Sequence, residues 1–267
     1  LVFQPFHKLV DEDSRYLANN DSIDPDLNYF NQFSLPSCKY VNTLDLSTVS
    51  KPESNKNVFS LLHVNCRGLS TNFPKLNSLI DEFDFKIPAI AVTETRLTPD
   101  RENDYSLPGY DFIAKSRSHK IGGGVGIYVS NDVSYNMRSE LVLNVPDVLE
   151  CVFIELVSYN VIVGCIYRPP NSDLARFTAE FDTLLAKINN TKKQCYIAGD
   201  YNINLLKCED HEPTNRYVNC VFSHSFLPII AKPTRITPNS SRFLVASSLT
   251  LGISRVSSSS PRLVSRT

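Results

Sequence analysis

The chain has 267 residues, of which 42% are hydrophobic, and its formal net charge at pH 7 is −1. This length and composition allow one large α/β domain or two small ones, and they exclude a chain that is too polar to form a core. No run of roughly 18 apolar residues occurs, so the sequence predicts an intracellular protein with no membrane partner.

The small net charge hides an uneven distribution of charged residues. Residues 1–62 carry eight acidic and five basic side chains, whereas residues 213–267 carry seven basic side chains and no acidic one. Binding to phosphate depends on the local field, so the net charge does not exclude nucleic acid as a partner. The seven cysteines are widely spaced and form no CxxC pair, which favours reduced thiols over disulfides or a zinc site.

Regular structure is expected to begin near residue 58. The preceding segment, 1–56, is rich in Asn, Asp, Ser and Pro without a sustained period, and it is predicted to be a mostly disordered leader. A strand is expected over 58–64. Apolar residues spaced for one helical face then predict a helix around 76–83, and a further strand follows over 87–92.

The middle of the chain is richer in strands. The apolar runs predict strands at 112–114, 125–129, 151–157, 161–167 and 195–198, with Tyr159-Asn160 as a hairpin turn and Gly199-Asp200 as a turn after the last strand. Helices are expected near 174–188 and 214–226, the second capped by Thr214 or Asn215. This order predicts an α/β fold with two packed mixed sheets flanked by helices.

The last segment breaks this alternation. From residue 239 serine dominates, with scattered arginines, so residues 239–267 are predicted to be an aberrant Ser/Arg-rich tail. The closing strands of the domain are therefore expected to be missing or non-native.

Polar side chains stand at the ends of four predicted strands. Asn65 and Glu94 each follow a strand, although a turn-forming Asn and a surface Glu are the simplest interpretations of each alone. Tyr167 ends a strand just before Arg168 and two prolines, and Asp200 follows the strand at 195–198, two residues before Asn202. Together these residues provide oxygen ligands for a divalent cation, a group to position water and donors to phosphoryl oxygens. The set predicts phosphodiester hydrolysis.

Three other features carry less functional weight. Gly122-Gly123-Gly124 precedes a strand instead of a helix, so a hairpin or a close backbone approach is expected there and a phosphate-binding loop is not. His63 lies within a predicted strand and is expected to be structural. His119 lies in a basic loop, 115–120, that is either solvated or in contact with a nucleic-acid backbone.

Six strings, in order, resemble the endonuclease/exonuclease/phosphatase superfamily, and most of all the endonuclease domain of non-LTR retrotransposons. They fall within residues 57–238 and read HVNCRGL (63–69), TETRL (93–97), GGGVGIYV (122–129), IYRPP (166–170), GDYN (199–202) and PTRIT (233–237). Each string is weak alone, and their order and spacing carry the resemblance. It implies a four-layered α/β sandwich.

The resemblance also implies roles for the matched residues. Glu94 and Asn65 would hold Mg²⁺ or Mn²⁺, Asp200 would orient or activate water, and Asn202 and Tyr167 would hydrogen-bond the scissile phosphate. Arg168 would add positive charge where substrate binds. The implied substrate is DNA, the implied location is the nucleus, and a reverse transcriptase domain, absent from this chain, is expected in the full-length element.

The chain departs from the family pattern after about Ser240. Family members continue with a strand that bears an Asp and end in a Ser-Asp-His run, whereas this chain has no acid after Glu212 and no histidine after His224. We therefore expect a truncated and impaired endonuclease. The alternatives are an inactive remnant that binds DNA and a phosphomonoesterase of the same superfamily.

Overall fold

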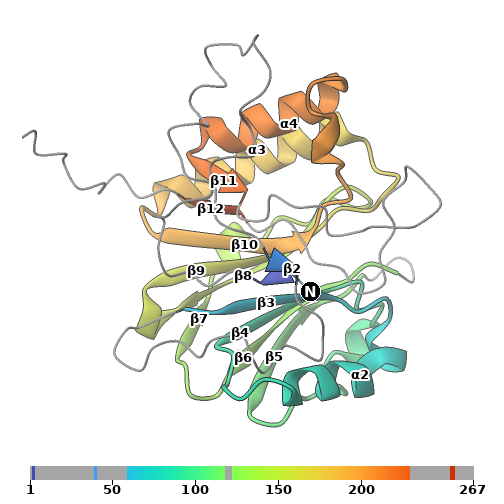
Figure 1. Ribbon diagram of the computed structural model, residues 1–267, viewed down its shortest axis with the longest axis vertical. Helices are drawn as coiled ribbons and strands as arrows, with labels where there is room; N and C mark the ends of the chain where they lie inside the picture. The colour runs from blue at the N-terminus through green and yellow to red at the C-terminus, as the bar shows by residue number, and fades with distance from the viewer. Residues whose placement is uncertain (1, 4–38, 41–58, 118–121, 229–252, 256–267) are drawn as a thin grey trace, which may run out of the picture.

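The computed structural model describes residues 2–3, 39–40, 59–117, 122–228 and 253–255 (Figure 1). Most of the predicted leader and of the predicted tail, and the loop with His119, lie outside these ranges. Within the leader segment, two short strands, β1 (Val2–Phe3) and β2 (Lys39–Tyr40), form an antiparallel pair.

Two larger sheets make up the described part of the fold. The four-stranded sheet has the order β3-β4-β6-β5, formed by β3 (Leu61–Asn65), β4 (Ala89–Thr93), β6 (Val125–Ser130) and β5 (Tyr110–Lys115). The six-stranded sheet has the order β11-β12-β10-β9-β8-β7, formed by β11 (Phe226–Pro228), β12 (Ile253–Arg255), β10 (Gln194–Asp200), β9 (Val161–Tyr167), β8 (Glu150–Leu156) and β7 (Tyr135–Met137).

Each large sheet contains one parallel pair of strands, β3 with β4 and β9 with β10, among antiparallel neighbours. In these pairs Asn65 is the partner of Thr93, and Tyr167 is the partner of Asp200. The carboxyl ends of parallel strands lie at the same edge of a sheet. The parallel pairing therefore places the polar strand-end residues of each sheet together.

Helices cover the outer faces of both sheets (Figure 1). The α-helices are α2 (Leu69–Asp81), beside the four-stranded sheet, and α3 (Leu174–Asn190) and α4 (Glu212–Ser223), beside the six-stranded sheet. Short 3-10 helices occupy connections at Pro99–Arg101, Ser139–Leu141, Val157–Tyr159 and Leu205–Lys207. None of the described helices has the length and apolar character needed to cross a bilayer.

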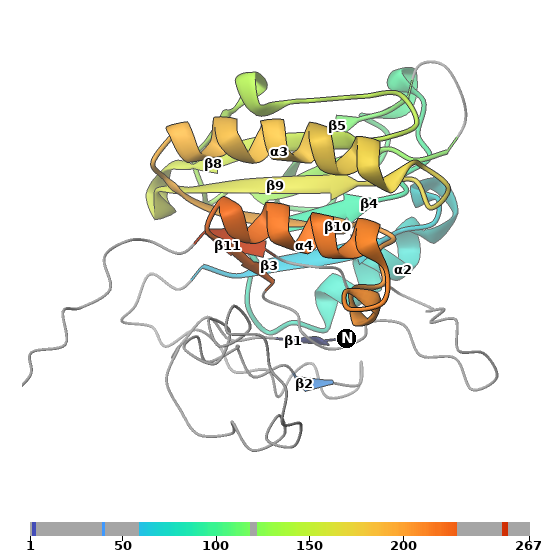
Figure 2. The same ribbon diagram turned by 90° about the horizontal axis from the view of Figure 1, so that it is seen from above.

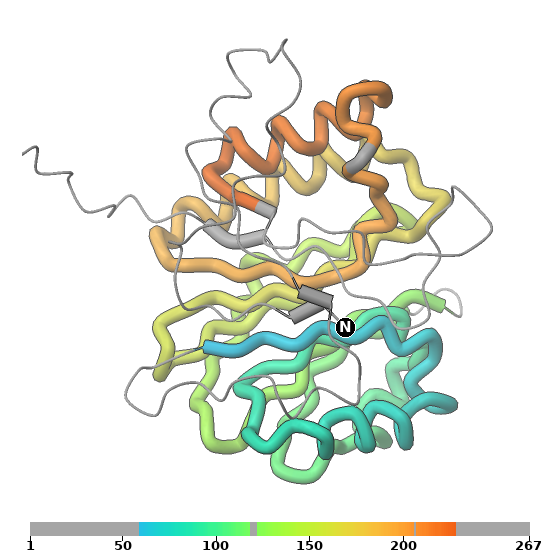
Figure 3. Tube along the Cα trace, viewed as in Figure 1, coloured from blue at the N-terminus to red at the C-terminus, as the bar shows by residue number. Residues whose placement is uncertain are grey.

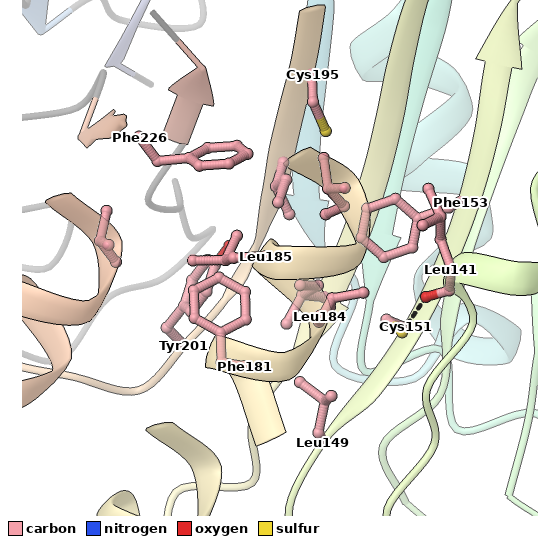
Figure 4. Packing of buried hydrophobic residues seen from close by; sticks show 14 of the residues in the cluster. Leu141, Leu149, Cys151, Phe153, Phe181, Leu184, Leu185, Cys195, Tyr201 and Phe226 are labelled. Atoms are coloured by element: carbon pink, nitrogen blue, oxygen red, sulfur yellow. Dashed lines mark hydrogen bonds between the residues drawn. The ribbon is translucent and has the colours of Figure 1, made fainter. Parts of the chain in front are cut away.

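Strand periodicity explains the layering. Along β8, Cys151 and Phe153 pack toward the helices, whereas Val152 and Ile154 pack toward the other sheet. Successive side chains of a strand point to opposite faces, so the buried runs serve two apolar layers. Figure 4 shows the helix-side layer, in which Leu184 of α3 lies close to Phe153.

The predicted four-layered sandwich is confirmed. One layer of buried residues joins α2 to the four-stranded sheet, a second joins the two sheets, and a third joins α3 and α4 to the six-stranded sheet. The tube trace in Figure 3 shows β3 beside β10, although they lie far apart in the sequence. This neighbour relation brings the two parallel pairs together.

Several boundary predictions are wrong. Gly199 and Asp200 are the last residues of β10 instead of a turn, because they pair in register with β9. The predicted hairpin between β8 and β9 is present; its connection is longer than the predicted Tyr159-Asn160 turn, because the 3-10 helix Val157–Tyr159 precedes Asn160, which has the left-handed conformation with φ 52°.

The predicted cap of the last helix is also wrong. Thr214 and Asn215 lie inside α4, which is preceded by His211 at the N-cap. Glu212 and Pro213 occupy the first turn, where an acidic side chain and a proline are both favourable. A short strand from the predicted tail, β12, pairs with β10 and β11, so the tail contributes at least one strand to the sheet.

Candidate active site

Asn65 joins the polar ends of the two sheets. Its Nδ2 donates to Glu94 Oε1 at 2.9 Å and to Asp200 Oδ2 at 2.7 Å. The first hydrogen bond stays within the four-stranded sheet, and the second crosses to the six-stranded sheet. Two carboxylates that are 106 residues apart in the sequence therefore accept hydrogen bonds from one amide nitrogen.

The loops that follow β3 and β4 hold this arrangement. The Arg67 backbone N–H donates to Asn65 Oδ1 at 3.1 Å, and the Gly68 N–H donates to the carbonyl oxygen of Glu94 at 2.7 Å. Arg67, Glu94 and Arg96 all have φ near 50°. Left-handed backbone is unfavourable for non-glycine residues and clusters at functional sites, so these loops carry local strain.

Glu94 already has two partners on its carboxylate. Oε1 accepts from Asn65, and Oε2 accepts from the Arg96 guanidinium at 2.8 Å. The Glu94 side chain is mostly buried, whereas about half of the Arg96 side chain is exposed. Arg96 therefore balances the charge of Glu94 from the solvent side.

Tyr167 ends β9 on the face that packs toward the other sheet. Burial raises the pKa of its phenol, and the negative charges of Glu94 and Asp200 raise it further. The phenol is therefore protonated at neutral pH, and its O–H is available as a donor. The Arg117 guanidinium lies 6.0 Å from the centre of the Tyr167 ring.

Asp200 and Asn202 lie in one short segment at the end of β10. The Asn202 backbone N–H donates to Asp200 Oδ1 at 3.2 Å, and Asn202 has φ 50°. The Asn202 Nδ2 donates to the carbonyl oxygen of Arg168 at 2.8 Å. Asn202 therefore lies beside Asp200, but its side-chain nitrogen is hydrogen-bonded to the loop that begins at Arg168.

The substrate-binding role predicted for Arg168 does not fit this geometry. Arg168 is only 5% exposed, and its Nη1 donates to the carbonyl oxygens of Tyr201 and Asn202 at 3.2 and 3.0 Å. Its Nη2 donates to Ser172 O at 2.5 Å, and its guanidinium lies 5.8 Å from the Phe177 ring centre. Arg168 is turned inward because these backbone acceptors surround it, so it supports the loops of the site.

Sequence reasoning missed a buried ion pair between Arg117 and Glu150. Both side chains are less than 10% exposed, and Glu150 Oε2 also accepts from the Gly124 backbone N–H at 2.6 Å. Glu150 is the first residue of the mostly apolar strand β8. A carboxylate at the start of a buried strand needs a cationic partner, and this position is the only sign of the ion pair in the sequence. Arg117, predicted within a basic loop that is either solvated or in contact with a nucleic-acid backbone, is instead held beside Tyr167.

The glycine run packs against the loop that carries Glu94. Gly123 and Gly124 both have positive φ, and their carbonyl oxygens accept from the Arg96 and Thr95 backbone N–H groups at 2.8 and 3.3 Å. A Cβ on Gly124 would lie 2.2 Å from Thr95 Oγ1. The predicted close backbone approach is confirmed.

His63 is buried in β3, as its position in an apolar run predicts. Its Nε2 lies 3.1 Å from Thr93 Oγ1, and burial lowers its pKa to about 3. A neutral imidazole inside the sheet is consistent with a structural role.

The donor atoms of the site suit a hard divalent cation. Asn65, Glu94 and Asp200 offer one carboxamide and two carboxylates, and oxygen ligands of this kind are preferred by Mg²⁺ and Mn²⁺. Two carboxylates close together also repel each other, so a cation between them would relieve that repulsion. The residues therefore fit a divalent metal.

The chain belongs to the endonuclease/exonuclease/phosphatase family, whose model matches residues 62–238. Members of this family generally depend on a divalent metal. The match begins within β3, extends past α4 and β11, and includes all six predicted site residues. A comparison with curated protein sequences gives no match.

Solved structures share this fold at low sequence identity. The chain is similar to an AP endonuclease from Archaeoglobus fulgidus, with a TM-score of 0.54, 16% identity, and 74% of this chain and 86% of that one covered. It is similar to the endonuclease domain of TRAS1, a telomere-specific non-LTR retrotransposon, with a TM-score of 0.52, 13% identity and coverages of 74% and 85%. It is also similar to a 3′ phosphatase from Neisseria bound to a product DNA hairpin, with a TM-score of 0.53, 12% identity and coverages of 73% and 86%.

Proposed function

We propose that this chain is a metal-dependent endonuclease domain of a retroelement protein, which hydrolyses a phosphodiester bond to nick target DNA. One observation carries the proposal: Asn65 holds Glu94 and Asp200 together at the meeting point of the two sheets. The site has the oxygen donors, the phenol and the amide that phosphodiester hydrolysis needs. A nuclear location and a reverse transcriptase domain elsewhere in the full-length protein belong to the same proposal.

The side chains divide the work by their chemistry. Glu94 and Asn65 hold the divalent metal, Mg²⁺ or Mn²⁺, which when bound supplies Lewis-acid stabilisation of charge on the phosphoryl oxygens. Asp200 orients the attacking water and accepts its proton. Tyr167 donates its O–H to the scissile phosphate, because its raised pKa keeps it protonated. Asn202 contacts the same phosphate after its amide leaves the Arg168 carbonyl oxygen.

The retroelement assignment rests on the sequence strings around these residues. The AP endonuclease, the TRAS1 domain and the 3′ phosphatase have similar folds, so the fold alone does not select among their activities. The string IYRPP at 166–170, which contributes Tyr167 and the buried Arg168, is the feature that favours the retroelement branch.

We further propose that these 267 residues cleave slowly by themselves. The family's Asp and His that act as a pair on the phosphate have no counterpart in this chain, since no acid follows Glu212 and no histidine follows His224. Loss of one general acid or one charge-stabilising contact typically lowers the rate by about 10² to 10⁴.

The test is nicking of supercoiled plasmid by the purified chain with Mg²⁺ at high enzyme concentration. We expect slow conversion to open circles that EDTA stops and that Glu94→Gln and Asp200→Asn each reduce by about 100-fold or more. Glu140→Gln, which changes an exposed side chain of a 3-10 helix, is the matched control and retains the wild-type rate. Cleavage that survives Glu94→Gln would show that this site is not responsible.

The same preparation distinguishes the alternatives. A phosphomonoesterase would release phosphate from 3′-phosphorylated oligonucleotides or inositol phosphates faster than it nicks plasmid. A DNA-binding remnant would bind DNA in a salt-sensitive manner without cutting it. Either result would overturn the endonuclease proposal.

A further inference from the structure

Helices α3 and α4 lie side by side on the outer face of the six-stranded sheet (Figure 2). They carry a second group of polar side chains, separate from the strand ends that form the candidate active site. Asp182 belongs to α3, Cys220 belongs to α4, and His224 is the C-cap of α4. The ligand atoms of these three residues all lie within 4.8 Å of one another.

The three side chains converge on one carboxylate oxygen. Asp182 Oδ1 lies 2.8 Å from His224 Nε2 and 3.6 Å from Cys220 Sγ. Cys220 and His224 are four residues apart at the end of a helix, a spacing that puts side chains on the same face. Ligand atoms around a tetrahedral zinc ion, with bonds of about 2.0 to 2.3 Å, lie roughly 3.3 to 3.8 Å apart, so small side-chain rotations would admit the ion.

A neighbouring amide positions the histidine ring. Asn189 Nδ2 lies 3.2 Å from His224 Nδ1 and 3.2 Å from the His224 carbonyl oxygen. Because an amide N–H only donates, this contact makes Nδ1 an acceptor and places the ring proton on Nε2, which donates to Asp182 Oδ1 at 2.8 Å. For Nε2 to bind an ion, the ring proton must move to Nδ1 and the Asn189 side chain must turn its Oδ1 toward that nitrogen.

The group is accessible from one side. The His224 side chain is 16% exposed and Cys220 is half-buried, whereas the Asp182 side chain is 58% exposed. An ion can therefore enter past Asp182 and be held on the inner side by the sulfur and the imidazole.

We propose that Asp182, Cys220 and His224 form a Zn²⁺ site that links α3 to α4 and leaves a fourth coordination position for water. A thiolate, an imidazole and a carboxylate are ligands that zinc accepts, whereas Mg²⁺ and Ca²⁺ prefer oxygen alone. On binding, Cys220 releases its proton to solvent and becomes the thiolate ligand. This proposal is independent of the proposed nuclease function.

The test is metal titration of the purified full chain after chelator treatment. We expect one equivalent of Zn²⁺ to bind in competition with a chromophoric chelator in the presence of excess Mg²⁺. Substitution of Co²⁺ should produce a thiolate-to-cobalt charge-transfer band, a signal that an all-oxygen site does not give. Zinc should also raise the Tm, because a ligand that binds only the folded state stabilises it.

Three variants identify the ligands. Cys220→Ser should abolish the charge-transfer band, and Asp182→Asn, at an exposed position that leaves folding intact, should weaken Zn²⁺ binding by about 10-fold or more. Cys208→Ser is the matched control, since Cys208 is a partly buried cysteine outside the group, and it should retain the band and the affinity. Absence of stoichiometric binding, or binding unchanged in both Cys220→Ser and Asp182→Asn, would overturn the proposal.

Discussion

At the scale of single residues, the two polar side chains that organise the site do so in opposite ways. Asn65 reaches out from a strand end and holds two carboxylates from different sheets. Arg168 turns inward and donates to carbonyl oxygens in two loops. The sequence predicts similar positions at a strand end for Asn65 and Arg168, because each residue follows an apolar run.

Arg168→Met provides a test of the inward role. Burial lowers the pKa of Arg168, and several backbone carbonyl oxygens accept hydrogen bonds from it. Removal of the guanidinium leaves those buried acceptors unpaired, so the free energy of unfolding should fall by about 3 kcal/mol in urea denaturation.

Arg216→Met is the control for this substitution, since the Arg216 side chain is 70% exposed and pairs only at the surface. Its unfolding free energy should stay within about 0.5 kcal/mol of wild type. If Arg168→Met is equally mild, the hydrogen bonds to the loops contribute little to folding.

At the scale of elements, the junction between β9 and β10 tolerates no side chain at Gly199. A Cβ there would lie 1.9 Å from the carbonyl oxygen of Ile166 on the neighbouring strand. Backbone cannot rotate away as a flexible side chain can, so the parallel pairing that aligns Tyr167 with Asp200 depends on this glycine.

Gly199→Ala should therefore separate the ends of β9 and β10 and lower the Tm strongly. Gly122→Ala is the control, because a Cβ at Gly122 meets only the end of Arg117 at 3.9 Å, so that its cost is limited to the backbone strain of φ 111°, about 1 to 3 kcal/mol. Thermal melts followed by far-ultraviolet circular dichroism compare the two. Equal Tm values for the two variants would show that β9 and β10 accommodate a side chain at residue 199 without loss of stability.

A second element-scale contact gives the fold a pH dependence. Glu155 of β8 is paired with Lys193, just before β10, and with Arg138 Nη1 at 2.7 Å. Its pKa lies below the ordinary value of 4.5, mainly because of the hydrogen bond from Lys193. The pair therefore stabilises the fold above the unfolded pKa, and this contribution disappears as the pH falls through the lower folded pKa.

Urea unfolding at about pH 6 and about pH 3 measures this contribution. Wild type should lose more stability between these conditions than Glu155→Gln, which has no charge to protonate. Glu209→Gln, at an exposed loop position, should retain the wild-type difference. Identical losses in wild type and Glu155→Gln would exclude Glu155 as a contributor.

At the scale of the whole molecule, one apolar layer joins the two sheets. Ile127 of β6 and Ile154 of β8 are both fully buried in it, and Cys165 Sγ of β9 donates to the Val92 carbonyl oxygen of β4 at 3.3 Å. Neither sheet can unfold without exposing the inner face of the other. The fold should therefore lose both sheets in one cooperative step.

This cooperativity is measurable with two probes. Tyrosine signals in near-ultraviolet circular dichroism report packing, and far-ultraviolet signals report backbone structure, so their denaturation curves should coincide. Ile154→Ala should lower the midpoint of both curves together, at a cost of about 2 to 5 kcal/mol. Separate transitions for the two signals would show that the sheets unfold independently.

The sequence by itself determined the layers and selected the residues of the candidate site. Buried strands and amphipathic helices have distinct apolar periods, and these predict the two sheets and their covering helices. Asn65, Glu94, Tyr167, Asp200 and Asn202 were also predicted together, from their places at strand ends and from the order of short strings. These patterns can be predicted from the sequence because each lies within one short segment and does not depend on which distant segment packs against it.

Only the tertiary structure decided which distant residues meet. The inward turn of Arg168, the buried pair of Arg117 with Glu150, and the group formed by Asp182, Cys220 and His224 each join segments whose pairing has no periodic signature. The helix caps and strand ends were misjudged for a related reason, since register with a neighbouring strand extended β10 through Asp200. The apolar period of a sequence shows which face of a helix or strand is buried. It does not show which other element that face packs against, because this depends on the three-dimensional arrangement.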